Sequence, residues 1–132
     1  MLGSAEFGDA IVLADFEAGI GTLTRLTETQ IDVVLVVVEP TPKSLEVGQR
    51  AAGLARERQM GRLIIVACRV RNDEDAELIR QTFPDNEIVL VPDDHAIVDA
   101  DHKGLSPLDS APDSPAVLAL TALAERLVPV PA

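Results

Sequence analysis

The chain has 132 residues, 47% of them hydrophobic, and carries 22 acidic against 11 basic side chains for a formal charge of −11. This length predicts one domain, residues 1–132, that can bury a core. The acidic field repels phosphate backbones and anionic lipids, so nucleic acid and membrane surfaces are not expected partners. One cysteine, Cys68, excludes an internal disulfide and a multi-thiolate zinc site within the chain. Without a signal peptide or an apolar run of about 20 residues, the expected location is cytoplasmic.

In chain order, residues 1–7 contain Gly3-Ser4 and Glu6-Phe7, dipeptides that cloning sites commonly leave behind, so this segment is a candidate cloning remnant. Four short, β-branched apolar runs then predict strands that are buried on both faces. Helical segments with capping residues lie between them. The predicted strands are Ala10–Ala14, Val33–Val38, Leu63–Ala67 and Ile88–Val91, and the predicted helices are Thr22–Thr29, Lys43–Gln59, Asp73–Phe83 and Ser114–Leu127, with a long acidic loop over 92–112.

This order of elements predicts an α/β fold, with an open and mainly parallel sheet of about four strands and flanking helices. If the strands lie in sequence order, right-handed crossovers place the connecting helices on one face. The other face then needs a cover, which the last helix, a second copy or another segment could provide. We therefore expect a homodimer or a complementing polypeptide as partner.

Acidic and polar residues follow the predicted strands, and ligands bind at the carboxyl ends of parallel strands. Asp15 and Glu17 could hold a magnesium-bound water or orient an attacking water, because a hard cation prefers oxygen ligands. Two solvated carboxylates on a turn explain the same residues equally well. His95 and His102 lie among aspartates in the 92–112 loop, but their spacing fits no zinc pattern. No Gly-rich phosphate loop with a lysine occurs in the chain.

The segment Asp15–Thr27, DFEAGIGTLTRLT, resembles the switch segment of the MinD/CooC branch of deviant-P-loop (SIMIBI) ATPases, which includes the nickel-insertion ATPases for carbon monoxide dehydrogenase. The segments that begin at Asp32 and Val91 are similar to later parts of the same family. The resemblance implies a partial P-loop NTPase-like, Rossmann-like fold that corresponds to the carboxyl-terminal half of such a protein. It implies switch-type catalytic roles for Asp15 and Glu17, Mg²⁺ held by Asp15 through water, and nucleotide-binding positions at Gly19, Glu39, Pro40, Arg69, Pro92 and Asp94.

Three parts of the family's machinery have no counterpart in these residues: the phosphate loop, the first switch and the cysteine pair that holds metal between subunits. The Asn-Lys pair that reads the base is replaced by Cys68-Arg69, and a thiol lacks the paired donor and acceptor of an amide. In the family, the phosphate-loop strand lies between the strands that here end at Asp15 and Glu39. The resemblance thus implies no cofactor for this chain alone, and Mg-ATP only with a complementing P-loop half.

Three hypotheses follow. The first is an ATPase-related domain that acts by protein–protein association, in regulation or metallocentre maturation, without hydrolysing ATP alone. The second is one part of a divided Mg-ATPase. The third is a receiver- or flavodoxin-like Mg²⁺-binding domain.

Overall fold

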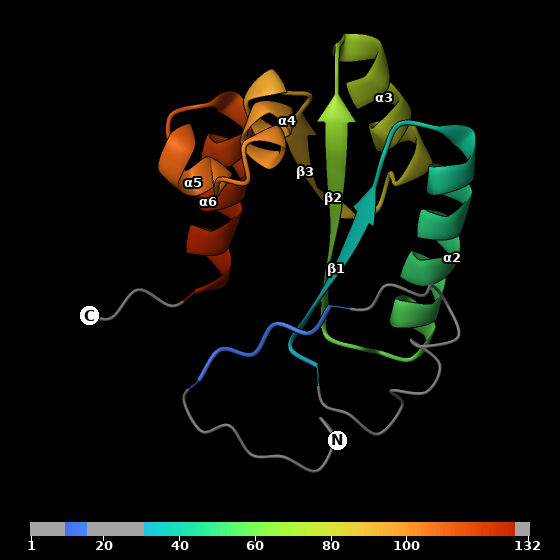
Figure 1. Cartoon of the computed structure of the whole chain (residues 1–132). Helices are drawn as coiled ribbons and strands as arrows, with labels where there is room; N and C mark the ends of the chain where they lie inside the picture. The colour runs from blue at the N-terminus through green and yellow to red at the C-terminus, as the bar shows by residue number, and fades with distance from the viewer. Residues whose placement is uncertain (1–9, 16–30, 129–132) are drawn as a thin grey trace.

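The computed structural model describes residues 10–15 and 31–128. A parallel sheet in the order β1-β2-β3 forms the centre, and helices lie on both of its faces (Figure 1). Between and after the strands the chain forms helices, the last three of which follow β3. The strands are β1 Val33–Val38, β2 Arg62–Val70 and β3 Glu87–Pro92, and the helices are α2 Pro42–Glu57, α3 Asp73–Thr82, α4 His95–His102, α5 Pro107–Ser110 and α6 Pro115–Leu127.

The α/β class and the parallel sheet are confirmed, but the described residues contribute three strands to it and not four. The predicted first strand, Ala10–Ala14, is wrong: these residues have no regular secondary structure, and Ile11 and Leu13 are 67% and 86% exposed. A strand is held by hydrogen bonds to a neighbouring strand, and this segment pairs with none of the described strands. The predicted helix Thr22–Thr29 lies outside the described residues.

The helices begin where the sequence provides caps. The Thr41 side chain accepts from the Ser44 amide at the start of α2, and Pro42 occupies the first turn. The Asn72 side chain accepts from the Asp75 amide at the start of α3. These caps follow directly on the strand ends, so they fix where the chain turns at the carboxyl edge of the sheet.

The two faces of the sheet are covered unequally. On one face, α2 and α3 enclose a core that includes Val38, Ile65 and Ile79, all nearly inaccessible to solvent. On the other face, α6 packs mainly against β3 and covers Ile64 and its neighbours. The β1 side of that face is less covered, and this is the part of the predicted bare face that α6 leaves open.

The segment 92–112, predicted as one long acidic loop, instead contains α4 and α5. Aspartates are typical of a solvent-exposed loop. In this segment, however, Asp94 caps α4, and Ala100 on that helix is buried. Among the described residues no helix has the length and apolar character needed to cross a membrane.

Candidate functional site

The carboxyl edge of the sheet begins with the turn that joins β1 to α2. The Glu39 amide donates to the Ser44 hydroxyl at 2.8 Å, and the Ser44 amide donates to Thr41 Oγ1 at 3.4 Å. These hydrogen bonds hold the backbone of the turn and leave the half-buried Glu39 carboxylate free to face β2.

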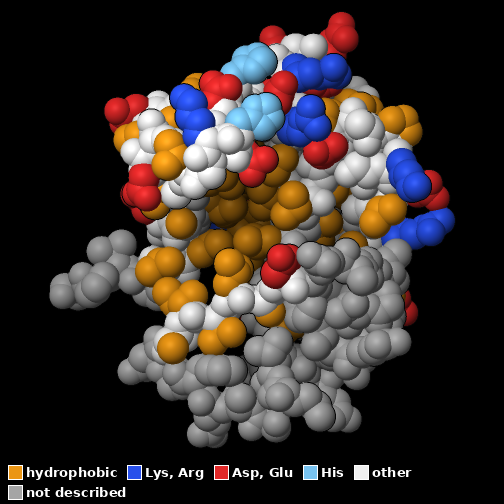
Figure 2. Space-filling view, viewed as in Figure 1, with side chains coloured by type: hydrophobic (Ala, Val, Ile, Leu, Met, Phe, Trp, Pro, Cys, Tyr) orange, Lys and Arg blue, Asp and Glu red, His pale blue; other side chains and the backbone are white. Residues whose placement is uncertain are grey.

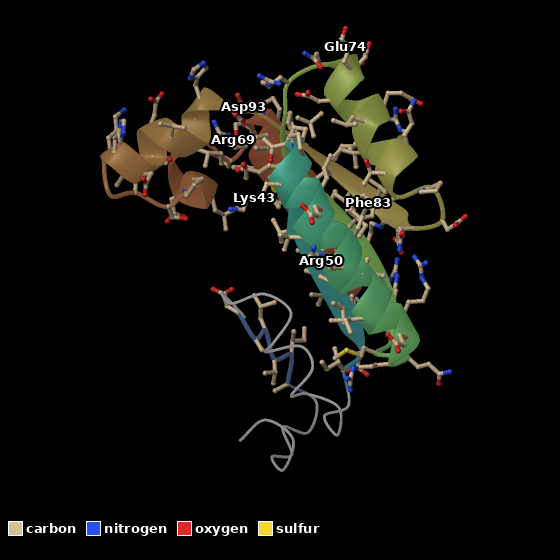
Figure 3. The ribbon with its side chains drawn as sticks, turned by 90° about the vertical axis from the view of Figure 1, so that its right-hand side faces the viewer. Lys43, Arg50, Arg69, Glu74, Phe83 and Asp93 are labelled. Carbon is tan, nitrogen blue, oxygen red and sulfur yellow. The ribbon has the colours of Figure 1, made fainter. Side chains whose placement is uncertain are left out.

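Arg69 lies at the centre of this edge. Its backbone φ is +58°, in the left-handed region, where the register between β2 and β3 shifts. A side chain in this region costs roughly 1 kcal/mol or more, so the surrounding structure must hold it. Arg69 Nη1 lies 3.7 Å from Glu39 Oε1, and Arg69 Nε lies 3.7 Å from Asp93 Oδ1. Figure 3 shows Arg69 and Asp93 side by side above the end of α2 that carries Lys43.

The Arg69 side chain is 68% exposed, so each of these ion pairs contributes little to stability. Their consequence is electrostatic. A guanidinium at the carboxyl edge would attract an anion, but here carboxylates from β1 and β3 flank it on both sides. An incoming phosphate group would meet Glu39 and Asp93 as well as the cation, and their like charge opposes its binding.

Asp94 is used as a double helix cap. Its Oδ1 accepts from the Ala96 amide in α4 and its Oδ2 from the Ala116 amide in α6, both at 3.0 Å. The Ala116 and Ala96 amides lower the pKa of the Asp94 carboxyl, because they stabilise its charged form. With a hydrogen bond to each of its oxygens, Asp94 ties α4 to α6.

Cys68 precedes Arg69 at the edge and is half-buried. Burial, and then the nearby Glu39 carboxylate, raise the pKa of its thiol. The thiol is therefore neutral at physiological pH and is a weak nucleophile.

The structure brings together Glu39 and Arg69 of the predicted site. Pro40 and Pro92 are half-buried at the ends of the turn and of β3, and Asp15 is exposed at the end of the described segment 10–15. Glu17 and Gly19 lie outside the described residues. Within the part of the chain that is described, no three His, Cys, Asp or Glu side chains lie together as metal ligands would, so the His95 and His102 segment forms no such group.

Two shallow hollows lie elsewhere on the surface. One of about 310 Å³ is lined by residues of α4, of α5 and of the turn between them, including Ile97 and Leu105. The other, of about 200 Å³, is lined by residues that include Gly53 and Phe83. Neither is lined by Glu39, Arg69 or Asp94, so the predicted nucleotide positions do not line them.

Sequence reasoning missed three contacts. The first is the ion pair between Asp93, in the acidic segment 92–112, and Arg69. Arg71, which precedes the Asn72 cap of α3, pairs with Asp75 of that helix at 2.9 Å, four residues further along the sequence. At the opposite edge of the sheet, Glu87 receives hydrogen bonds from two arginines, Arg62 and Arg126, which come from distant parts of the chain and give no local signal.

No protein-family model matches the chain. It is 34% identical over 100 residues to an uncharacterized ATP-binding protein of Methanocaldococcus jannaschii, covering 73% of this chain and 38% of that protein. It is 32% identical over 121 residues to the carbon monoxide dehydrogenase accessory protein CooC of Rhodospirillum rubrum, covering 89% of this chain and 46% of CooC. Over most of its length the chain is thus similar to one part of CooC.

The fold of the chain is similar to that of part of MinD. The MinD cell division protein of Aquifex aeolicus matches with a TM-score of 0.61 and 22% identity, over 80% of this chain and 48% of that one. The predicted resemblance to the CooC- and MinD-type, ATPase-related proteins is therefore confirmed. The chain spans less than half the length of the curated relatives it matches.

Proposed function

We propose that this CooC-like chain acts by association with another polypeptide, in regulation or metallocentre maturation in the cytoplasm, and does not hydrolyse ATP alone. The observation that carries the proposal is the state of the carboxyl edge. Both oxygens of Asp94 cap helices, and Arg69 lies between two carboxylates. The described residues of this edge do not fit a Mg-ATP group, and the sequence has no phosphate loop to hold one.

The relatives support the class of protein. One carries ATP-binding in its name, and CooC is an accessory protein of carbon monoxide dehydrogenase. A domain that keeps this fold without a phosphate-gripping edge retains surfaces for other proteins. Association with another polypeptide, unlike ATP hydrolysis, does not require a phosphate-binding loop.

The test is a thermal unfolding titration with Mg-ATP, with Mg²⁺ alone as control. A ligand that binds only the folded state at ten times its Kd stabilises it by about 1.4 kcal/mol. For a domain of this size that would raise the midpoint by several degrees. We expect no rise at sub-millimolar Mg-ATP beyond the Mg²⁺ control. A clear, saturable rise would overturn the proposal.

A second candidate is one part of a divided Mg-ATPase, with the phosphate loop on another polypeptide. The observation that favours it is the coverage of the relatives, of which this chain accounts for 38% and 46%. In that case Asp15 would be the candidate Mg²⁺ ligand through water. The experiment is to add a polypeptide with a Gly-Lys phosphate loop from a neighbouring reading frame and repeat the titration. A Mg-ATP-dependent rise only in the mixture would support this candidate over the first.

A further inference from the structure

The hollow of about 310 Å³ beside α4 is built on a tightly held piece of backbone. Gly104 follows α4 with a φ of +66°, in the left-handed region that glycine adopts without strain. The Gly104 amide donates to the Asp101 carbonyl at 3.1 Å, and the Leu105 amide donates to the Ala100 carbonyl at 2.8 Å. This pair of bonds is a Schellman motif, which turns the chain back against the end of its own helix. Because Pro107 then fixes the first turn of α5, binding does not have to order this backbone first.

The walls of this hollow are apolar side chains of α4, of the turn after it and of α5: Ile97, Val98, Leu105 and Pro107. Asp101 is the charged residue among the described residues that line it. Val98 and Leu105 are 48% and 52% exposed, and Leu108, next to Pro107 in the sequence, is 61% exposed. Large apolar side chains that are grouped around a concave surface, rather than scattered singly, are typical of a site for another protein.

The segment 92–114, which forms the hollow, is strongly acidic, with six aspartates against one lysine. Figure 2 shows acidic side chains beside hydrophobic ones over α4 and α5. In α2, α3 and β3 a carboxylate is paired with an arginine. No ion pair between described residues involves four of the aspartates, Asp99, Asp101, Asp109 and Asp113. The negative charge around the hollow therefore favours a cationic partner.

We propose that the hollow between α4 and α5 is the docking site for a basic amphipathic segment of a partner polypeptide. The segment places an apolar side chain against Val98 and Leu105 and a lysine or arginine against Asp101. A helix with leucines three or four residues apart and basic residues beside them presents both groups on one face. This inference rests on the proposed function, association, and names a surface for it.

Two other occupants fit the hollow less well. A second copy of the chain brings a net charge of −11 to a surface that already repels carboxylates. A small ligand is normally enclosed in a pocket of roughly 300–1,000 Å³. This hollow is at the lower end of that range and is shallow, so it suits one or two side chains of a protein segment better than a small molecule.

The test uses the full chain and a short labelled peptide with leucine at every fourth position and alanine and lysine between them. Binding is followed by fluorescence anisotropy. We expect saturable binding that weakens as salt is added, because the rim charges are exposed. A peptide with alanines in place of the leucines tests the apolar contact, and one with glutamates in place of the lysines tests the charge. We expect each of these to bind at least about tenfold more weakly.

Two pairs of protein variants locate the binding. Leu105→Ala removes part of the wall, whereas Leu118→Ala removes a leucine of α6 that is exposed to the same extent, 53% against 52%, and does not line the hollow. Asp101→Asn and Glu57→Gln each remove one negative charge from the last turn of a helix, and of the two only Asp101 lines the hollow.

We expect Leu105→Ala and Asp101→Asn to raise the Kd of the basic peptide at least about threefold, and the two control variants to change it less than about twofold. Circular dichroism checks that each variant is folded. If Leu105→Ala disturbs the turn after α4, Val98→Ala removes a side chain of the same wall from a helix interior, where alanine is well tolerated, and becomes the deciding variant.

Three outcomes would overturn the inference. The basic peptide could fail to bind. The control variants could weaken binding as much as Leu105→Ala and Asp101→Asn, which would mean that net charge alone attracts the peptide. Sedimentation of the free chain could show a dimer that Leu105→Ala dissociates, which would mean that a second copy occupies the hollow. None of these results changes the Mg-ATP titration, so this inference and the proposed lack of ATP binding can fail separately.

Discussion

Two glycines in α2 provide a sharp test of how this helix packs on the sheet. Gly48 is buried in the middle of α2. A Cβ added there would lie 2.4 Å from Val38 Cγ1 and 3.3 Å from Phe83 Cζ. Val38 and Phe83 are 1% and 2% exposed, and the β-branched Val38 side chain has little rotational freedom to move aside. Gly53, in the same helix, has no atom within 4 Å of the corresponding position.

The two substitutions by alanine therefore differ in sign. Replacing glycine in a helix interior gains about 1 kcal/mol from helix propensity alone. Overpacking a well-filled core costs about 1–3 kcal/mol. We expect Gly53→Ala to raise the free energy of unfolding by about 1 kcal/mol. Gly48→Ala should lower it by up to about 2 kcal/mol, the difference between those two estimates.

Urea unfolding followed by circular dichroism measures both variants on one scale. The difference between their midpoints is the informative quantity, because the gain from propensity is common to both. Val38→Ala alone also destabilises the core, but the loss in the double variant Gly48→Ala, Val38→Ala should be smaller than the sum of the two single losses, because the clashing methyl group is removed. If Gly48→Ala were as stabilising as Gly53→Ala, α2 would not approach β1 as closely as described.

Three further predictions concern ionisable groups. Asp94→Asn keeps one acceptor and Asp94→Ala keeps none, so the melting temperature should fall more for alanine. Because the folded-state pKa of Asp94 is lowered, both losses should be full above the ordinary aspartate pKa and fade as the pH falls through the folded value; equal losses at all pH values would refute the double cap. The thiol of Cys68 should react with iodoacetamide more slowly than a free cysteine at neutral pH. Glu39→Gln should speed the reaction, since the Glu39 carboxylate helps to raise the pKa of the thiol. An unchanged reaction rate in Glu39→Gln would contradict this. Glu87→Gln should lower the melting temperature at neutral pH. The pKa of Glu87 is lowered mainly by the hydrogen bond from Arg62, so the difference should fade as the pH falls through that lowered pKa. A difference that does not change with pH would contradict the ion pair.

The three buried strands were predictable because their evidence is local. Consecutive β-branched residues, as in Val33–Val38, favour a strand covered on both faces, and the structure places a strand at each of these three runs. The fourth run, Ala10–Ala14, carries the same pattern and forms no strand. A sequence pattern reports apolarity, whereas a strand also needs a neighbour to pair with, and none of the described strands pairs with this segment.

The candidate site was predictable in position more than in chemistry. Parallel strands bring Glu39, Arg69 and Asp93 to one edge, and the sequence identifies each strand end. The use of Asp94 could not be foreseen, because one of its hydrogen bonds reaches Ala116, 22 residues away. The sequence predicts a loop over 92–112 because aspartates are typical of solvent-facing turns, and only the tertiary structure shows that one of them, Asp94, caps two helices.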